Sequence, residues 1–206
     1  MSFDQQAQDW DKDPKKVERA EIIAREINDF IQPNHKLDGF EFGCGTGLLS
    51  YYLKDHFKTI TLADTSKGMI AVLEEKIKKE ELHHFNALLL DLLTDRVPQK
   101  KYDVVYTLMT MHHILDTEKI LQKFSDIIKP GGYLCLADLD KEDGSFHSQM
   151  PDFNGHFGFN RAELSKLLKQ NGFQVEYNEI CYEIVRIKED VKKSYPLFLM
   201  IGKKME

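Results

Sequence analysis

The sequence is poor in cysteine, and its three cysteines are Cys44, Cys135 and Cys181. Their number is odd, they are far apart, and no two of them stand in a C-x-x-C pair. Neither a disulfide framework nor a cysteine-based zinc site is therefore predicted. Because Cys135 and Cys181 lie in strand-like runs, we expect both to be small buried hydrophobic side chains.

Long apolar runs and excess positive charge are also missing. No stretch approaches the roughly 18 apolar residues of a membrane-spanning helix, and residues 1–13 are polar and acidic, unlike a signal or transit peptide. The chain carries 28 basic and 34 acidic residues, a net charge of −6, which argues against a broad surface for nucleic acid. We therefore expect a cytoplasmic protein with neither a membrane nor a nucleic acid as partner.

Three glycines at alternate positions mark the most informative stretch of the chain. Residues 37–42 read as a short strand and Leu48 begins a helix, with Gly43, Gly45 and Gly47 between them. A strand that turns directly into a helix leaves backbone N–H groups unpaired, and glycine lets a ligand approach them without meeting a Cβ. The dinucleotide-binding pattern requires its third glycine at position 48, where this chain has leucine. The turn therefore predicts a bound ligand of another kind.

Strand and helix patterns alternate along the chain. The segments that read as strands are 37–42, 59–64, 85–90, 102–108, 133–139, 173–187 and 195–201. The segments with helical periodicity are 14–31, 66–80, 117–129 and 161–170. Such alternation predicts a parallel sheet with helices on both faces. The last two strands are joined by residues 188–194 without a helix and must be antiparallel. We predict an α/β fold, a Rossmann-like doubly wound sheet of seven strands that is mostly parallel and ends in an antiparallel hairpin.

Five elements in a fixed order resemble the motifs of class I S-adenosylmethionine (SAM)-dependent methyltransferases. Residues 41–47 resemble their E/D-x-G-x-G-x-G motif, and Asp64 and Asp91 end the second and third strands. Residues 111–116, M-H-H-I-L-D, resemble the segment with two histidines between hydrophobic residues in small-molecule methyltransferases. Residues 129–134, K-P-G-G-Y-L, resemble their entry to strand five. The chain is similar to the broad group that includes the ubiquinone- and menaquinone-biosynthesis methyltransferases.

This resemblance implies that the cofactor is SAM. It places Glu41 near the α-amino group and Asp91 at the adenine amine, with Leu92 and Met69 against the ring. An acid in the position of Asp64 accepts hydrogen bonds from both hydroxyls of a ribose. We expect Cys44 to fill space in the loop rather than act as a nucleophile. The expected cofactor-binding residues are Glu41, Gly43, Cys44, Gly45, Gly47, Asp64, Thr65, Met69, Asp91, Leu92 and Thr107.

Methyl transfer from SAM is an in-line displacement, and much of its catalysis comes from holding the reactants collinear. His112 and His113 follow strand four and are candidates to take a proton. The alternative is that one packs inward and the other caps the next helix. Asp138 and Asp140 suit Mg²⁺ chemically, but such pairs usually mark a solvated strand end, so no metal is expected. Residues 141–159 are expected to form a wall of the acceptor pocket.

We expect a single domain over residues 1–206 that methylates a small-molecule acceptor, as a monomer or homodimer. Residues 1–33 are its N-terminal arm and helix, and the aromatic residues of the arm either cover a ligand or pack on the surface. Residues 107–110 lack the N/D-P-P-Y/F motif of methyltransferases that act on nucleic-acid base amines or glutamine amides. One alternative is a non-catalytic SAM-binding protein. Another is an NAD-dependent oxidoreductase, which the pattern at position 48 and the terminal hairpin disfavour.

Overall fold

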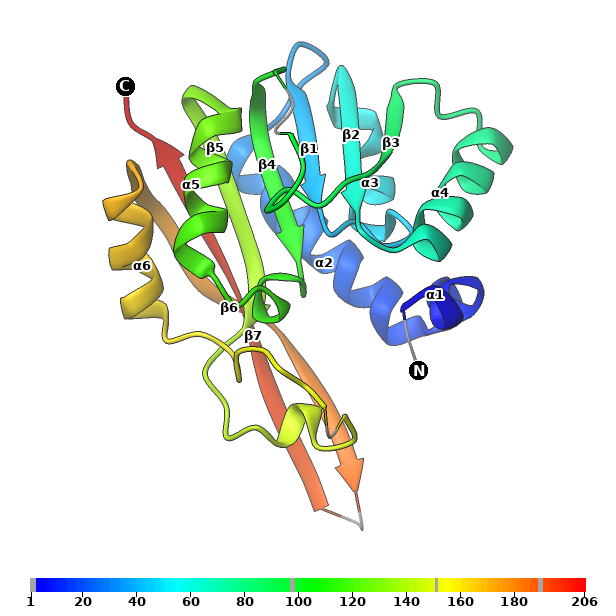
Figure 1. Ribbon diagram of the computed structural model, residues 1–206, viewed down its shortest axis with the longest axis vertical. Coiled ribbons are helices and arrows are strands. Elements are labelled where there is room, and N and C mark those ends of the chain that lie inside the picture. The colour runs from blue at the N-terminus through cyan, green and yellow to red at the C-terminus, as the bar shows by residue number, and fades with distance from the viewer. Residues whose placement is uncertain (1–2, 97–98, 151, 189–190) are drawn as a thin grey trace.

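The computed structural model describes residues 3–96, 99–150, 152–188 and 191–206. They contain a seven-stranded sheet in the order β3-β2-β1-β4-β5-β7-β6 (Figure 1). The strands are β1 Asp38–Phe42, β2 Thr59–Asp64, β3 Phe85–Leu89, β4 Tyr102–Leu108, β5 Ile128–Leu139, β6 Phe173–Lys188 and β7 Val191–Lys204. The first five strands pair in parallel, and β7 is antiparallel to both β5 and β6. The predicted fold class, including the terminal hairpin, is confirmed.

Helices cover both faces of the sheet. The helical elements are α1 Phe3–Gln6, η1 Ala7–Lys12, α2 Pro14–Ile31, α3 Leu48–Leu53, η2 Lys54–His56, α4 Lys67–Lys79, η3 Met111–His113, α5 Thr117–Ile127, η4 Ser145–His147 and α6 Arg161–Gln170. Apolar residues of α2, α3 and α4 pack into one core, and those of α5 and α6 pack into a second. Successive side chains of β4 pack into opposite cores, because side chains alternate across a strand. Val104 packs into the first core and Val105 into the second. Within the described ranges, no helix has the length and apolar character needed to cross a membrane.

The helix boundaries follow from local capping signals in the sequence. The Asp13 side chain accepts a hydrogen bond from the Lys15 N–H at 3.0 Å. Asn160 accepts from the N–H groups of Ala162 and Glu163 at 2.9 and 3.2 Å. Each cap satisfies donors that the first helical turn leaves free, and the loss of one typically costs about 1 kcal/mol. The positions of both caps were predictable from the sequence alone.

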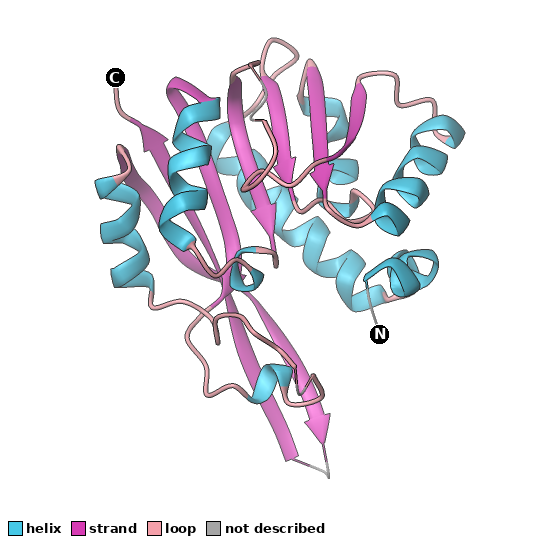
Figure 2. Ribbon diagram, viewed as in Figure 1, coloured by secondary structure: helices cyan, strands magenta, loops and turns pink. Residues whose placement is uncertain are grey.

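The terminal hairpin is longer than the sequence predicted. Residues 188 and 191–194 were expected in the connection, but Lys188 pairs with Val191 at the end of the ladder. The two strands extend well beyond the rest of the sheet (Figure 2). Polar residues extend such a ribbon because the hydrogen bonds of the ladder join backbone groups, whatever the side chains are. One of them, Lys193, forms an ion pair with Asp143 at 2.6 Å.

The N-terminal arm is the second difference from the predicted structure. Residues 3–10 were expected to be irregular, yet they lie in the helical elements α1 and η1. They lie against α4, so long-range contacts rather than local periodicity order this segment.

Candidate functional site

The turn between β1 and α3 holds its three glycines in the left-handed region of backbone space. Their φ angles are +64° at Gly43, +52° at Gly45 and +76° at Gly47. A Cβ at Gly43 would lie 2.2 Å from Thr110 Cγ2, and one at Gly47 would lie 2.8 Å from Leu73 Cδ1. The packing of the protein itself therefore requires glycine at these two positions.

Gly45 has a different environment, because a Cβ there would meet no atom closer than 3.8 Å. The neighbours at that distance are Met69 Sδ and Trp10 Nε1. The Gly45 N–H donates to Asp64 Oδ2 at 2.7 Å, and the Ser66 N–H donates to Asp64 Oδ1 at 2.8 Å. The structure thus brings together the central glycine, the acid after β2 and Met69, three residues that the sequence assigned to one site. The Asp64 carboxylate orders the turn and keeps further lone pairs for other donors.

The N-terminal arm is fastened to the rim of this site by two acidic side chains. Asp4 Oδ1 accepts hydrogen bonds from Ser66 Oγ at 2.6 Å and from the N–H of Gly68 at 2.7 Å. Asp11 accepts from the Thr46 hydroxyl and pairs with Lys76. The arm therefore bridges the glycine turn and the start of α4.

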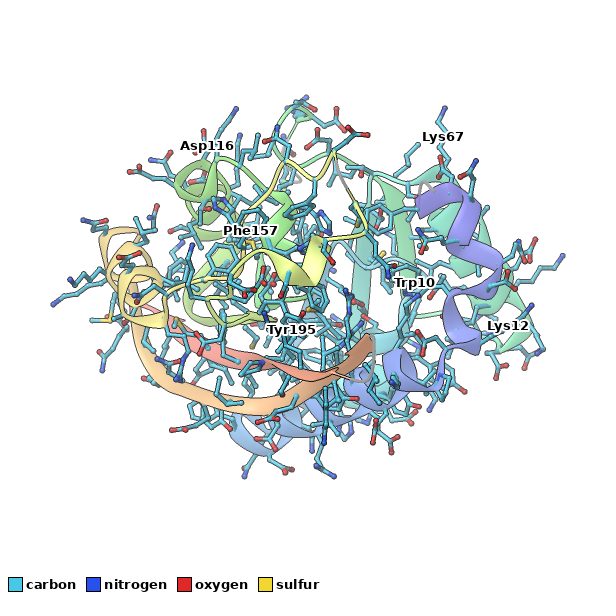
Figure 3. All side chains as sticks on the ribbon, turned by 90° about the horizontal axis from the view of Figure 1, so that it is seen from below. Trp10, Lys12, Lys67, Asp116, Phe157 and Tyr195 are labelled. Carbon is cyan, nitrogen blue, oxygen red and sulfur yellow. The ribbon has the colours of Figure 1, made fainter. Side chains whose placement is uncertain are left out.

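Aromatic rings of the arm face the ends of the strands. The Phe3 ring contacts Trp10 edge-on at 5.9 Å between centroids, and His113 at 5.5 Å. Figure 3 shows Trp10 on the inner side of the arm. This side chain lies beside the glycine turn, since its Nε1 is 3.8 Å from the position of a Gly45 Cβ.

Glu41, the acid of the glycine motif, is buried beneath the turn, with 2% of its surface exposed. Its Oε2 accepts from Ser50 Oγ at 2.5 Å and from the Ser50 N–H at 3.2 Å. The same serine hydroxyl lies 2.8 Å from the Tyr106 hydroxyl. Burial raises the pKa of Glu41 from 4.5 to about 8. The structure shows a bond that ties β1 to α3, and the expected contact of Glu41 with the cofactor stays a prediction.

The raised pKa of Glu41 has a measurable consequence for stability. Between pH 4.5 and 8 the folded protein holds a proton on Glu41 that the unfolded chain releases. The free energy of unfolding must then fall with rising pH, by up to about 1.4 kcal/mol per unit. We expect the free energy of unfolding of the wild type, relative to that of Glu41→Gln, to fall between pH 5 and 8. Above pH 8 the difference between the two proteins should be constant. Urea denaturation of both proteins across this range measures it, and a difference that does not depend on pH would refute the assignment.

The remaining expected cofactor residues have mixed environments. Asp91 follows β3 in a turn, where its Oδ1 accepts from the Leu93 N–H at 2.9 Å. Leu92 is fully buried in the core next to α5, whereas Thr65 is exposed. Thr107 is also fully buried, and its hydroxyl has no hydrogen-bond partner among the described residues. Leu92 thus has a packing role in the core, and Thr107 places a buried, unpaired hydroxyl one residue before the end of β4.

The environments of the three cysteines raise the pKa of each thiol and so disfavour the thiolate. Cys44 and Cys135 are buried, and burial raises the pKa of each thiol, so both stay protonated near neutral pH. Cys135 is buried as predicted, but Cys181 is only partly buried. It lies on β6, which forms one edge of the sheet and has no strand on its outer side. The prediction of full burial for Cys181 is wrong for that reason.

The two histidines after β4 lie in η3 and have distinct partners. His112 is 1% exposed, with its Nδ1 2.6 Å from Asp138 Oδ1 and its backbone N–H donating to Asp138 Oδ2 at 3.1 Å. Asp138 is itself 1% exposed, so the expectation of a solvated strand end is wrong for this residue. The reason is that β5 lies between β4 and β7, and Asp138 pairs with Phe198. The cap of α5 is Asp116 rather than His113.

His147 is a further candidate residue that the sequence did not single out. It lies in η4, is 6% exposed, and stacks on Phe153 with ring centroids 3.6 Å apart. Its ring centroid is 5.1 Å from that of His112 and 6.0 Å from that of His113. Burial lowers the pKa of His113 and of His147 to about 4, which leaves both imidazoles neutral near pH 7. No spacing rule would have found this residue in a loop without periodicity.

The loop over residues 141–159 is held beside these histidines. The His156 N–H donates to the His112 carbonyl at 2.7 Å, and His156 Nε2 lies 2.9 Å from the Ile114 carbonyl. The loop thus closes on η3 at the carboxyl ends of β4 and β5. Ligands of open α/β sheets bind at this edge. The role of the loop as an acceptor wall stays a prediction.

Comparisons with known proteins show a family and a shared fold. Residues 16–178 match the family model described as a methyltransferase domain. The chain is 34% identical over 143 residues to an uncharacterized methyltransferase of Schizosaccharomyces pombe, covering 63% of this chain and 50% of that one. It is 25% identical over 143 residues to the ubiquinone biosynthesis O-methyltransferase of Coxiella burnetii, covering 68% and 60%. The matches thus span between half and 60% of the length of these relatives. A SAM-dependent methyltransferase structure from Aquifex aeolicus has the same fold, with a TM-score of 0.67, 18% identity, and coverage of 94% of this chain and 99% of that one.

Proposed function

Because the chain belongs to the family of methyltransferase domains, we propose that it transfers a methyl group from SAM to a small-molecule acceptor. The observation that carries this proposal is the Asp64 carboxylate, which accepts a hydrogen bond from Gly45, the one glycine of the turn whose Cβ position the protein does not block. A carboxylate one strand from a glycine-rich turn suits a ligand with a ribose.

Several residues fit the parts of SAM. Gly45 would let the methionine end of the cofactor approach the backbone, and Asp64 would hold the ribose hydroxyls. Asp91 would accept from the adenine amine, and the unpaired Thr107 hydroxyl offers a donor at the end of β4. The proposed cofactor-binding residues remain Glu41, Gly43, Cys44, Gly45, Gly47, Asp64, Thr65, Met69, Asp91, Leu92 and Thr107. When bound, SAM supplies an electrophilic methyl group on a positively charged sulfur.

His112 and His113 are the proposed catalytic residues. The His112 Nδ1–H donates to Asp138, which orients the ring and leaves Nε2 as the proton acceptor. His113 is less buried, and its lowered pKa keeps it neutral near pH 7 while making it a weaker base than an ordinary histidine. A hydroxyl or ammonium acceptor that loses its proton to either ring becomes a better nucleophile. Asp138 acts through His112 and is a positioning residue.

A small acceptor fits the aromatic character of the loop beside the histidines. Phe153 stacks on His147 and lies 5.9 Å from Phe157 between ring centroids. The net charge of −6 does not favour a nucleic-acid acceptor. The Coxiella burnetii relative is named as a ubiquinone biosynthesis O-methyltransferase, which supports an oxygen atom on a small, partly apolar molecule.

Incubation with methyl-labelled SAM and a panel of phenols, quinols, thiols and amines tests this function. We expect label to pass to at least one class of acceptor, and to a much lower extent with the double variant His112→Ala and His113→Ala. Binding of SAM without transfer to any acceptor would favour a non-catalytic SAM-binding protein. No binding of SAM at all would refute the proposed function.

The arm is proposed to cover the bound cofactor, because Trp10 lies beside Gly45. We expect Trp10→Ala to speed dissociation of SAM several-fold, since a side chain that shields the ligand is lost. Lys12→Ala is the matched control, because Lys12 lies in the same 3₁₀ helix and its exposed side chain pairs with exposed Asp9. Displacement of methyl-labelled SAM by excess unlabelled SAM, sampled by rapid filtration, measures both dissociation rates, and equal rates for the two variants would show that the arm does not cover the ligand.

A further inference from the structure

We propose that His112, His113 and His147 form a three-imidazole site for one divalent transition metal ion, and that Zn²⁺ suits it best. The fourth position of this site would bind the heteroatom of the methyl acceptor. Only this second statement rests on the proposed function, because metal binding by three imidazoles requires no cofactor.

The three side chains converge from two separate segments of the chain. His112 and His113 come from η3, and His147 comes from η4 in the loop beyond β5. One ring nitrogen of each residue lies within 4.8 Å of one ring nitrogen of the other two. Zinc–nitrogen bonds of about 2.0–2.1 Å at tetrahedral angles separate ligand nitrogens by roughly 3.3 Å. Small rotations of the rings therefore bring them to the distances that a metal ion requires.

The second observation is an unpartnered nitrogen on one member of this cluster. His147 is 6% exposed, and its Nδ1 is buried without a hydrogen-bond partner among the described residues. Buried polar atoms in folded proteins nearly always have a partner, and an orphan requires an explanation. The ring cannot turn away freely, because it is stacked on Phe153 with an interplanar angle of 2°. A metal ion held between the three rings would supply the missing partner.

The third observation is the carboxylate behind His112. The Nδ1–H of His112 donates to Asp138, so its lone pair is on Nε2, the nitrogen that remains for a metal ion. Asp138 is itself fixed by the N–H groups of His112 and Leu139, at 3.1 and 2.7 Å. A carboxylate that orients a ligating histidine is the usual outer partner in zinc sites.

The donor set determines which metal ions fit. Neutral imidazoles favour zinc, iron, copper or nickel, whereas Mg²⁺ and Ca²⁺ prefer oxygen ligands. Three protein ligands with one open position are typical of catalytic rather than structural zinc. The sequence had suggested Asp138 and Asp140 for a cation. In the structure Asp138 supports a ligand instead, and Asp140 faces Arg161 Nε at 3.6 Å.

A metal ion at this place would replace the proton-accepting role proposed for His112 and His113, because it would occupy their lone pairs. The ion would lower the pKa of an acceptor hydroxyl or thiol bound to it, because the cation stabilises the anion. The proton of that group would pass to solvent. The oxygen or sulfur then forms a bond to the methyl carbon as the bond from that carbon to the sulfonium sulfur breaks. The products are the methylated acceptor and neutral S-adenosylhomocysteine.

The test uses the full chain, stripped of metal by chelation and titrated with Co²⁺ and Zn²⁺. We expect about one ion per chain by mass spectrometry of the metal content, and a visible absorption band of tetrahedral Co²⁺. His147→Ala and His147→Gln should each weaken metal binding more than tenfold, and Asp138→Asn should weaken it about tenfold. His83→Ala, which removes an exposed histidine after α4, should leave it unchanged.

Calorimetry with SAM on the same metal-free samples separates this inference from the proposed function. Wild-type protein that binds SAM but no more metal than His147→Gln would overturn the metal site and leave the histidines as proton acceptors. Protein that binds one metal ion but no SAM would support the metal site and refute the proposed function. Equal metal affinity in the wild type and both His147 variants, with all three folded by circular dichroism, would also overturn the metal site.

Discussion

Replacing Asp64 with alanine is expected to weaken SAM binding about 100-fold. The carboxylate would accept hydrogen bonds from two ribose hydroxyls, and bonds to a charged group contribute about 1.5–3 kcal/mol each. A loss of about 3 kcal/mol corresponds to roughly 100-fold in affinity. The substitution also frees the N–H groups of Gly45 and Ser66, which the two carboxylate oxygens now hold. Isothermal titration calorimetry with SAM measures the change in affinity.

Two comparison variants make the Asp64 result specific. Asp64→Asn keeps the shape and one acceptor oxygen, so it separates loss of charge from disorder of the glycine turn. Asp138→Ala removes a carboxylate that contacts His112 rather than the turn, and we expect it to change SAM affinity less than about threefold. An equal loss of affinity in Asp64→Ala and Asp138→Ala, with both proteins folded, would show that the ribose does not lie at Asp64.

Gly45→Ala is expected to reduce SAM affinity by about 100-fold or more while the protein stays folded. A Cβ at Gly45 would be in ordinary van der Waals contact with Met69 Sδ and Trp10 Nε1, both at 3.8 Å, so the new methyl group fits beside the turn without a clash. This position beside the turn is where we propose that the cofactor approaches the backbone. The positive φ of +52° adds a strain of about 1–2 kcal/mol to the folded state. Calorimetry and thermal denaturation separate these two effects.

Gly131→Ala is the matched control for this prediction. Gly131 has a φ of +75°, and a Cβ there would have no neighbour within 4 Å. It therefore carries a similar backbone strain, at the start of β5 and away from the glycine turn. Both variants should lose similar stability, but only Gly45→Ala should lose affinity. Gly45→Ala with the SAM affinity of Gly131→Ala would exclude a cofactor at the turn.

Much of the fold was predictable because its signals are local. Apolar alternation, the glycine turn and caps such as Asp13 and Asn160 depend on neighbours in the sequence. The antiparallel hairpin followed from the absence of a helix between two strands. The grouping of Gly45, Asp64 and Met69 also followed, since parallel strands place their carboxyl ends at one edge of the sheet.

The parts that escaped prediction depend on contacts between distant segments. The pairing of His112 with Asp138 is set by the register of β4 against β5, which no local pattern encodes. His147 is 35 positions from His112 in a loop without periodicity, and reaches it only because the loop folds back on η3. The helical arm likewise depends on contacts of Asp4 and Asp11 with α4 and the glycine turn.

Titration of the purified chain with SAM, S-adenosylhomocysteine and NAD⁺ in a calorimeter tests the central claim most directly. We predict binding heats for SAM and S-adenosylhomocysteine at one site per chain, with SAM affinity weakened about 100-fold in Asp64→Ala, and no heat for NAD⁺. Heat with NAD⁺ and none with either sulfur nucleoside would contradict the account.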